Sequence, residues 1–149
     1  MDHGCWSVLL KMFPKADIPV VQISIDSTKP PQYHYNLSQQ LSRLREKGIL
    51  IIGSGNIVHN LRMMNPDNQD YDWAREFDER IKNLIINGDH ESIINYDKIG
   101  TAARLSIPTN EHYLPLLYTL ALWDRNEDIR FFNEKIDLGS ISMRSLILG

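Results

Sequence analysis

The stretch GILIIGSGNIVHN, residues 48–60, decides the fold expected for this chain. Its apolar run from Ile49 to Ile52 has the length and composition of a buried strand, and Gly53-Ser54-Gly55 predicts a tight turn at the end of that strand. His59 follows this turn. A histidine in that position either carries chemistry or fills space, and residues 48–60 alone leave both interpretations open.

The residues before this stretch predict a second strand and a helix between the two strands. Residues 18–25, IPVVQISI, are rich in β-branched side chains and predict a strand. Residues 36–47 carry leucines at helical spacing, and Gly48 stands where a helix C-cap is expected. Strand, crossover helix and strand form the βαβ unit of a parallel sheet. We therefore expect an α/β fold with three layers, in which helices cover both faces of a largely parallel sheet. Such sheets bind ligands beyond the carboxyl ends of their strands, where GSGNIVHN lies.

The rest of the chain predicts further helices and a strand-rich tail, all within one domain spanning residues 1–149. Helices are expected at residues 5–13 before Pro14, at residues 70–86, at HESIINY after Gly88-Asp89, and at residues 110–123 with Thr109 as N-cap. Two strands separated by a turn near Leu138-Gly139 are expected to end the chain.

Composition and charge exclude several classes of partner. The chain has 16 basic and 19 acidic residues and no basic cluster that could follow a phosphate backbone, so nucleic acid is not expected as a partner. No apolar run approaches the roughly 18 residues of a membrane span, and the start MDHGCWSV does not resemble a signal peptide. We expect no membrane association and a cytoplasmic location. Cys5, the single cysteine, excludes an internal disulfide and is interpreted as a small packed residue rather than a nucleophile.

The glycine-rich turn and the five histidines are the candidates for chemistry. A lone GxG lacks the third glycine of a dinucleotide fingerprint and the GK[ST] of a P-loop, so a structural turn is favoured over a phosphate cradle. The spacing of the histidines matches neither a zinc finger nor an HExxH helix, so the fold would have to assemble any metal site. Taken alone, His59 is equally consistent with a functional and a structural role, whereas a structural role is favoured for His112. His3 is expected to lie in a frayed N-terminus, and His34 and His90 are expected to lie at the surface. Because His59 and His112 both follow elements expected to end at the carboxyl edge of the sheet, we predict that their side chains converge there.

Five segments together resemble one known family. They are DHGCW (2–6), IPVVQISI (18–25), LREKGILIIGSGNIVHNLR (44–62), PTNEHYLPLLYTLA (108–121) and GSISMRS (139–145). In this order they are similar to the catalytic domain of class III extradiol ring-cleavage dioxygenases, and most of all to the branch of the DOPA 4,5-dioxygenases. The resemblance extends over nearly the whole chain.

The resemblance implies a doubly wound α/β domain and a non-haem metal site with Fe(II) or Zn(II). Such a site binds both oxygens of a catechol-type diol such as DOPA together with O₂, and the ring opens beside the diol. By resemblance, His59 is the acid/base at the metal and is sometimes a ligand, His112 is a metal ligand, and His3 lines the substrate pocket. Neutral imidazole suits either metal, and a histidine that titrates near neutrality can take the diol proton and return it.

One departure from the family matters for function. Family members begin earlier, and the additional part carries two further histidine ligands that neither His34 nor His90 matches. The chain therefore corresponds to the C-terminal part of the family's domain and is truncated relative to it. Three explanations stay open: a truncated gene, a companion segment that supplies the missing ligands, or a non-catalytic remnant. A metal-dependent hydrolase is a weaker alternative, because neither a nucleophile nor a carboxylate cluster is evident.

Overall fold

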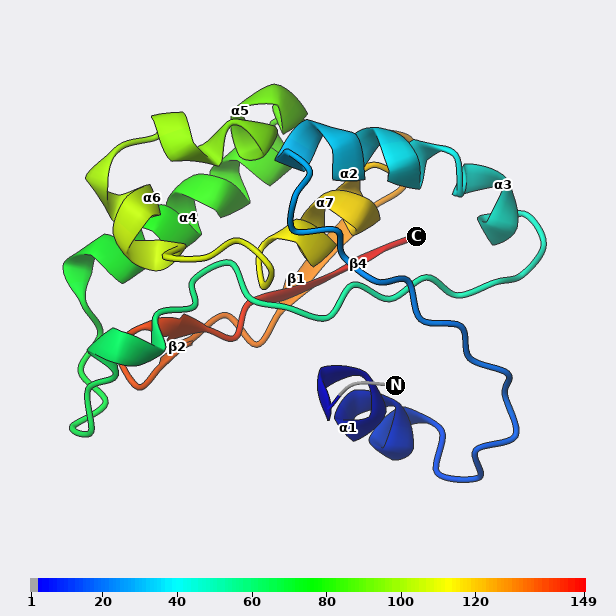
Figure 1. The fold of residues 1–149 in the computed structure, drawn as a ribbon, viewed down its shortest axis with the longest axis horizontal. Coiled ribbons are helices and arrows are strands. Elements are labelled where there is room, and N and C mark those ends of the chain that lie inside the picture. The colour runs from blue at the N-terminus through cyan, green and yellow to red at the C-terminus, as the bar shows by residue number, and fades with distance from the viewer. Residues whose placement is uncertain (1–2) are drawn as a thin grey trace.

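The computed structural model describes residues 3–149, with the side chain of His3 outside the described part. Helices dominate, and most of them form one layer (Figure 1). The α-helices are α1 (His3–Met12), α2 (Pro31–Gln39), α3 (Ser42–Arg45), α4 (Asp72–Ile86), α5 (His90–Ile94), α6 (Thr101–Ser106) and α7 (Leu114–Leu120), and the 3₁₀ helices are η1 (Leu61–Met63) and η2 (Tyr96–Lys98). In the described residues, no helix combines the length and the apolar character that crossing a bilayer requires.

The helical layer is built on the apolar side of α4. Helix α4 packs against α6, and α2 packs against α7. The side chains that α4 buries recur at helical spacing, and burial of this stripe is what stabilises the helix. They are Ala74, Phe77, Ile81, Leu84 and Ile85, together with the polar Asp78. Leu114, Leu117 and Leu120 of α7 complete the same core.

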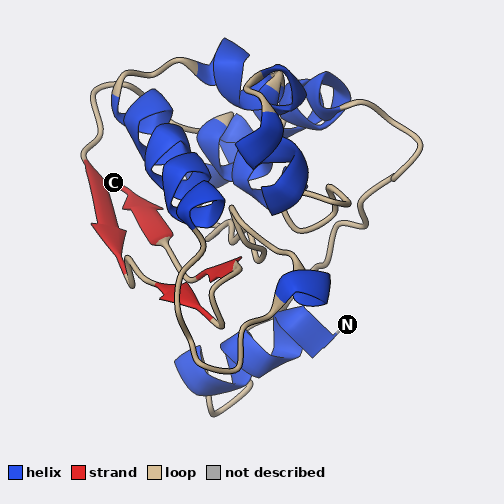
Figure 2. Ribbon diagram, turned by 90° about the vertical axis from the view of Figure 1, so that its left-hand side faces the viewer, coloured by secondary structure: helices blue, strands red, loops and turns tan. Residues whose placement is uncertain are grey.

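In the described residues, four short strands form two antiparallel pairs, so each of the two strands expected at the end of the chain is divided in two. Strand β1 (Ile129–Phe132) pairs with β4 (Ser145–Leu148), with Ile129 opposite Leu148. Strand β2 (Ile136–Asp137) pairs with β3 (Ile141–Ser142), and the turn between them includes Leu138 and Gly139, as predicted. The two pairs follow one another along the side of the helical layer (Figure 2).

The expected parallel sheet is not observed. Residues 18–25 and 49–52 run as extended chain between the helical layer and α1, but neither segment belongs to a strand (Figure 1). A parallel strand exists only through hydrogen bonds to its neighbours, and the described residues provide no ladder for either segment. The prediction of a largely parallel sheet was therefore wrong for this chain, whereas mixed helix and strand content is confirmed.

Two predicted helices also differ in extent. The helix expected over residues 36–47 is divided into α2 and α3, and α2 begins earlier because Pro31 is well suited to the first turn of a helix. Gly48 follows α3 with a φ of 74°, which agrees with the predicted C-cap. The helix expected over residues 110–123 is limited to α7, which has Pro115 in its first turn. Thr109 does not cap it, and instead its hydroxyl donates to Glu111. Helices α1, α4 and α5 lie close to their predicted positions, and Asp89 caps α5 by accepting from the N–H of Ser92.

Candidate functional site

His59 lies in a segment that hydrogen bonds anchor on two sides. Val58 before it is fully buried. The backbone N–H of His59 donates to the carbonyl of Ser106 over 2.9 Å, and His59 forms an isolated antiparallel bridge with Ile141. The side chain of Asn60 donates to the carbonyl of Leu105 over 2.7 Å. The backbone that carries His59 is therefore held between the end of α6 and strand β3.

His112 lies in the turn before α7, directly beside the chain that leads to His59. The N–H of Asn56 donates to the carbonyl of His112 over 2.8 Å. At Gly55 a Cβ would collide with that carbonyl, and at Gly53 a Cβ would lie 2.6 Å from the carbonyl oxygen of Pro115. The glycines thus allow two backbones to approach closely. The predicted tight turn at residues 53–55 was wrong, because these residues run without a turn.

The two histidine rings stack on one another. Their centroids are 3.6 Å apart and their planes are inclined by 12°. The sequence-based prediction that these side chains lie together is confirmed, and tertiary contacts between distant segments, not the edge of a parallel sheet, produce this arrangement.

The surroundings of the pair favour neutral imidazole at His59. Burial lowers the pKa of His59, and the neighbouring His112 lowers it further, while the Glu111 carboxylate acts in the opposite direction. Burial alone would raise the pKa of Glu111, but the hydrogen bond from Thr109 and the nearby histidines lower it on balance. An ionised carboxylate and a neutral imidazole are thus held next to each other, which is the state that binds a cation or accepts a proton.

The donor atoms at this pair fit a divalent metal in type but not in number. Imidazole nitrogen suits both Fe(II) and Zn(II). In the described part of the chain, however, no group of three or more His, Cys, Asp or Glu side chains could hold a metal ion. The rings are nearly parallel, so their in-plane lone pairs do not converge on one point, and one ring must turn before both can bind the same ion. His59 and His112 can therefore supply part of a coordination sphere.

Among the described side chains, His34 and His90 do not join the pair. His34 is fully buried in α2, where its Nδ1 lies 3.0 Å from the hydroxyl of Tyr118, so the predicted surface position was wrong. His90 is partly buried, and its Nδ1 lies 2.6 Å from the hydroxyl of Tyr35. The side chain of His3 lies outside the described residues.

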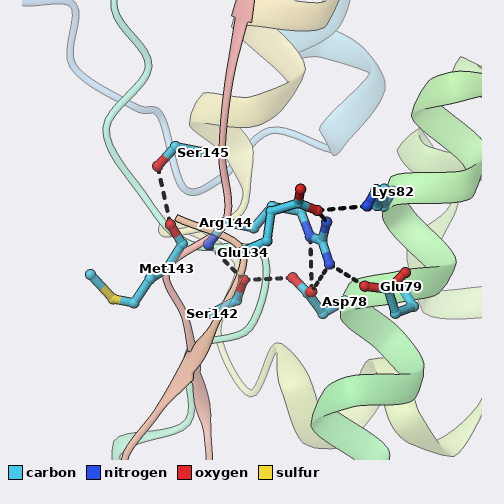
Figure 3. Close-up of polar contacts among 8 residues, drawn as sticks. All are labelled: Asp78, Glu79, Lys82, Glu134, Ser142, Met143, Arg144 and Ser145. Carbon is cyan, nitrogen blue, oxygen red and sulfur yellow. Dashed lines mark hydrogen bonds and ion pairs between the residues drawn. The ribbon is translucent and has the colours of Figure 1, made fainter. Parts of the chain in front are cut away.

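The buried Arg144 anchors the β2–β3 hairpin to helix α4 (Figure 3). Arg144 donates to Asp78 of α4 from Nε over 2.8 Å and from Nη2 over 2.6 Å, and it also contacts Glu79 and Glu134. Its side chain is only 2% exposed. The hydroxyl of Ser142 donates to the same Asp78 carboxylate over 2.5 Å. Arg144 and Ser142 thus tie the hairpin to α4.

This anchor reaches the histidine segment through Ser142. The N–H of Ser142 donates to the carbonyl of Val58 over 2.9 Å, and the side-chain amide of Asn56 donates to the carbonyl of Ser142 over 2.7 Å. The sequence predicted no individual role for the residues of GSISMRS. An arginine in an otherwise apolar and serine-rich tail indicates a buried ion pair, although the sequence does not show which carboxylate it meets.

Two hollows in the surface do not include the histidine pair. One of about 290 Å³ lies between Pro30–Gln32 and residues 94–98, and another of about 610 Å³ is lined by residues that include Arg45, Leu50 and Glu127. Neither hollow is lined by His59 or His112.

Comparisons with known proteins agree on one family. The model of the catalytic LigB subunit of aromatic ring-opening dioxygenase matches residues 1–138. The chain is 49% identical to a 4,5-DOPA dioxygenase extradiol of Escherichia coli K12, over 99% of this chain and 56% of that protein. It is 34% identical to the 4,5-DOPA dioxygenase extradiol of Beta vulgaris, over 97% of this chain and 54% of that protein.

A solved structure agrees with the sequence comparisons. It is the crystal structure of the uncharacterized protein JW3007 from Escherichia coli K12, which superposes with a TM-score of 0.90 at 45% identity and covers 98% of this chain and 62% of its own. The chain thus spans between 54% and 62% of the length of these three proteins. By the extent of these matches, it belongs to the family of catalytic LigB subunits of aromatic ring-opening dioxygenases.

Proposed function

We propose that this chain forms the C-terminal part of an extradiol dioxygenase that cleaves a catechol-type diol, such as DOPA, with O₂ at a non-haem metal. The observation that carries this proposal is the stacking of His59 on His112, because it brings together two nitrogen donors from distant segments. The names of the E. coli and Beta vulgaris relatives support the reaction class and the substrate class. Residues 1–149 are proposed to form one domain, and the protein is proposed to act in the cytoplasm.

The roles proposed for the histidines come from the resemblance to the family, and their surroundings in the structure support them. His112 holds the metal, and His59 exchanges a proton with the diol and contributes to metal binding. Burial keeps His59 neutral near pH 7, so its ring nitrogen can accept the proton of a diol hydroxyl and return it after ring opening. A bound Fe(II) or Zn(II) would supply the centre on which diol and O₂ meet. Glu111 adds negative charge beside the pair and favours cation binding there.

His3 is proposed to line the substrate pocket. As a residue that binds substrate without supplying a donor to the metal, it should affect KM more than kcat when it is replaced. The expected result for His3→Ala in an active sample is a raised KM for DOPA with kcat nearly unchanged. A large loss of kcat at unchanged KM would contradict this role.

A second function is favoured by the number of donors. With two histidines and no group of three donors among the described residues, the chain can be a non-catalytic remnant or a subunit that needs a companion segment. The two functions make different predictions for one experiment. O₂ uptake is measured with Fe(II) and DOPA for the chain alone and for the chain mixed with the part of the E. coli relative that lies outside its match.

We expect ring cleavage by the mixture and none by the isolated chain. It should then fall about 10² to 10⁴-fold in His59→Ala, as expected for loss of a general acid/base, whereas His112→Ala should lower metal occupancy. His90→Gln is the matched control, because His90 does not contact the pair. Full turnover by the isolated chain would overturn the need for a companion, and an inactive mixture with bound metal would favour the non-catalytic function.

A further inference from the structure

The two extended segments expose an unusual amount of apolar side chain. Val21 is 89% exposed and Leu50 is 64% exposed, although both belong to apolar runs typical of buried strands. We define the open apolar surface by the exposed residues of these two segments, which are Ile18, Val20, Val21, Ile23, Ile49, Leu50 and Ile52. Large exposed apolar patches are typical of interaction sites in folded proteins.

The pattern of exposure shows what kind of partner the open apolar surface requires. Along an extended chain, neighbouring side chains point to opposite sides. Val20 and Val21 are adjacent and both exposed, as are Ile49 and Leu50, so each segment presents apolar side chains on both sides. Strands that are apolar on both sides belong to the interior of a parallel sheet. The partner must therefore supply strands for the edges and apolar cover for the faces.

A second copy of this chain would not meet that requirement. It could add a strand at one edge, but it would offer the same two segments and leave apolar side chains exposed on their faces. The similar solved structure retains this chain's arrangement with a TM-score of 0.90, and 62% of its own length is matched, so that longer protein has further chain available to cover the surface. The E. coli relative, which matches over 56% of its length, is also longer.

We propose that the open apolar surface docks the polypeptide segment that corresponds to the unmatched part of these relatives, which pairs its strands with residues 18–25 and 49–52. This inference rests on the proposed function in requiring that companion. The segment 49–52 continues through the close approach at Gly53 and Gly55 to His59. Strands paired beside it would therefore end near His59 and His112, where the missing ligands are needed.

Binding is tested without metal, diol or O₂. The fluorescently labelled part of the E. coli relative outside its match is titrated with the chain, and anisotropy gives the Kd. Val21→Glu and Leu50→Glu should each weaken binding about tenfold or more, because each places a charge in an apolar interface. Ile86→Glu on α4 is the matched control, since Ile86 is a 55% exposed isoleucine away from this surface, and it should leave the Kd unchanged. Far-UV circular dichroism checks that all three variants keep their helices.

The possible outcomes separate this inference from the proposed function. Tight binding that Val21→Glu and Leu50→Glu weaken supports the docking surface, even if the complex then fails to cleave DOPA. No binding by the parent chain, or equal binding by all variants, overturns it. Self-association of the chain that Val21→Glu abolishes, without binding of the labelled segment, would assign the surface to a second copy and also overturn it.

Discussion

The backbone N–H of Asn56 donates to the carbonyl of His112 over 2.8 Å. This bond joins the segment that leads to His59 with the turn that precedes α7. The stacked imidazole rings thus lie on two backbones that are already hydrogen-bonded to each other. The arrangement of the histidine pair depends on main-chain packing as well as on the side chains themselves.

Gly55→Ala should destabilise the chain and disturb the histidine pair. A Cβ at residue 55 would collide with the carbonyl of His112, and backbone cannot move aside as a flexible side chain can. Overpacking of this kind costs about 1 to 3 kcal/mol in the free energy of unfolding. Urea denaturation measures the loss, and Ser54→Ala at the exposed neighbouring position is the control. If Gly55→Ala unfolds at the same urea concentration as Ser54→Ala, the close approach is not required.

Replacing Arg144 by Leu should be more damaging. The substitution leaves the buried Asp78 carboxylate without its guanidinium partner, and breaking a buried ion pair costs about 3 to 5 kcal/mol. Arg75→Leu, which removes the exposed pair with Asp72, should change the free energy of unfolding by about 1 kcal/mol or less.

A double replacement distinguishes charge from packing at the same site. Combining Arg144→Leu with Asp78→Leu should recover part of the lost stability, because no unpaired charge remains buried. Chemical denaturation is compared for the parent chain, the single variants Arg144→Leu and Asp78→Leu, and the double variant. No recovery in the double variant would show that shape, rather than the unpaired charge, causes the loss.

Stability should fall as the pH is lowered, with a contribution from His90. Burial lowers the pKa of His90 below its ordinary value of 6.5, and the positive charge of Arg125 lowers it further, while Asp89 opposes both. Tyr35 contacts its Nδ1, and its buried Nε2 has no hydrogen-bond partner in the described structure. Between pH 6.5 and the lower folded-state pKa, the unfolded chain binds the proton and the folded chain does not. The stability contribution is therefore complete above pH 6.5 and is lost as the pH falls through the folded-state pKa.

His90→Gln isolates this contribution. Urea unfolding from pH 7.5 to pH 5 should show a shallower loss of stability in the variant than in the parent chain, because the variant lacks the imidazole whose pKa burial lowers. Parallel curves for the two proteins would exclude His90 as a source of the pH dependence.

Divalent metal should bind the isolated chain weakly. His59 and His112 provide two strong donors, and their stacked rings must rearrange before both can bind one ion. Calorimetric titration with Zn(II) should show low affinity in the parent chain, and His59→Ala or His112→Ala should each weaken it further, while His90→Gln leaves it unchanged. Tight binding of one metal per chain would reveal a donor outside this pair.

Local sequence signals determined much of the secondary structure. The extents of α1, α4 and α5, the cap at Asp89 and the positive φ of Gly48 all follow from apolar spacing and from residues that favour helix ends. These features depend on neighbours a few residues away, so the sequence contains nearly all the relevant information. The apolar character of residues 18–25 and 49–52 was also evident, and it remains the feature on which the docking surface depends.

Only the tertiary structure decided which segments meet. Whether residues 18–25 become a strand depends on a neighbouring strand, and the described chain does not supply one. The burial of His34 against Tyr118, the partner of Arg144 and the reason for the glycines at 53 and 55 all depend on contacts between residues far apart in sequence. Backbone preference acts over a few residues, whereas hydrogen-bonded pairing and burial are settled only when the whole chain packs.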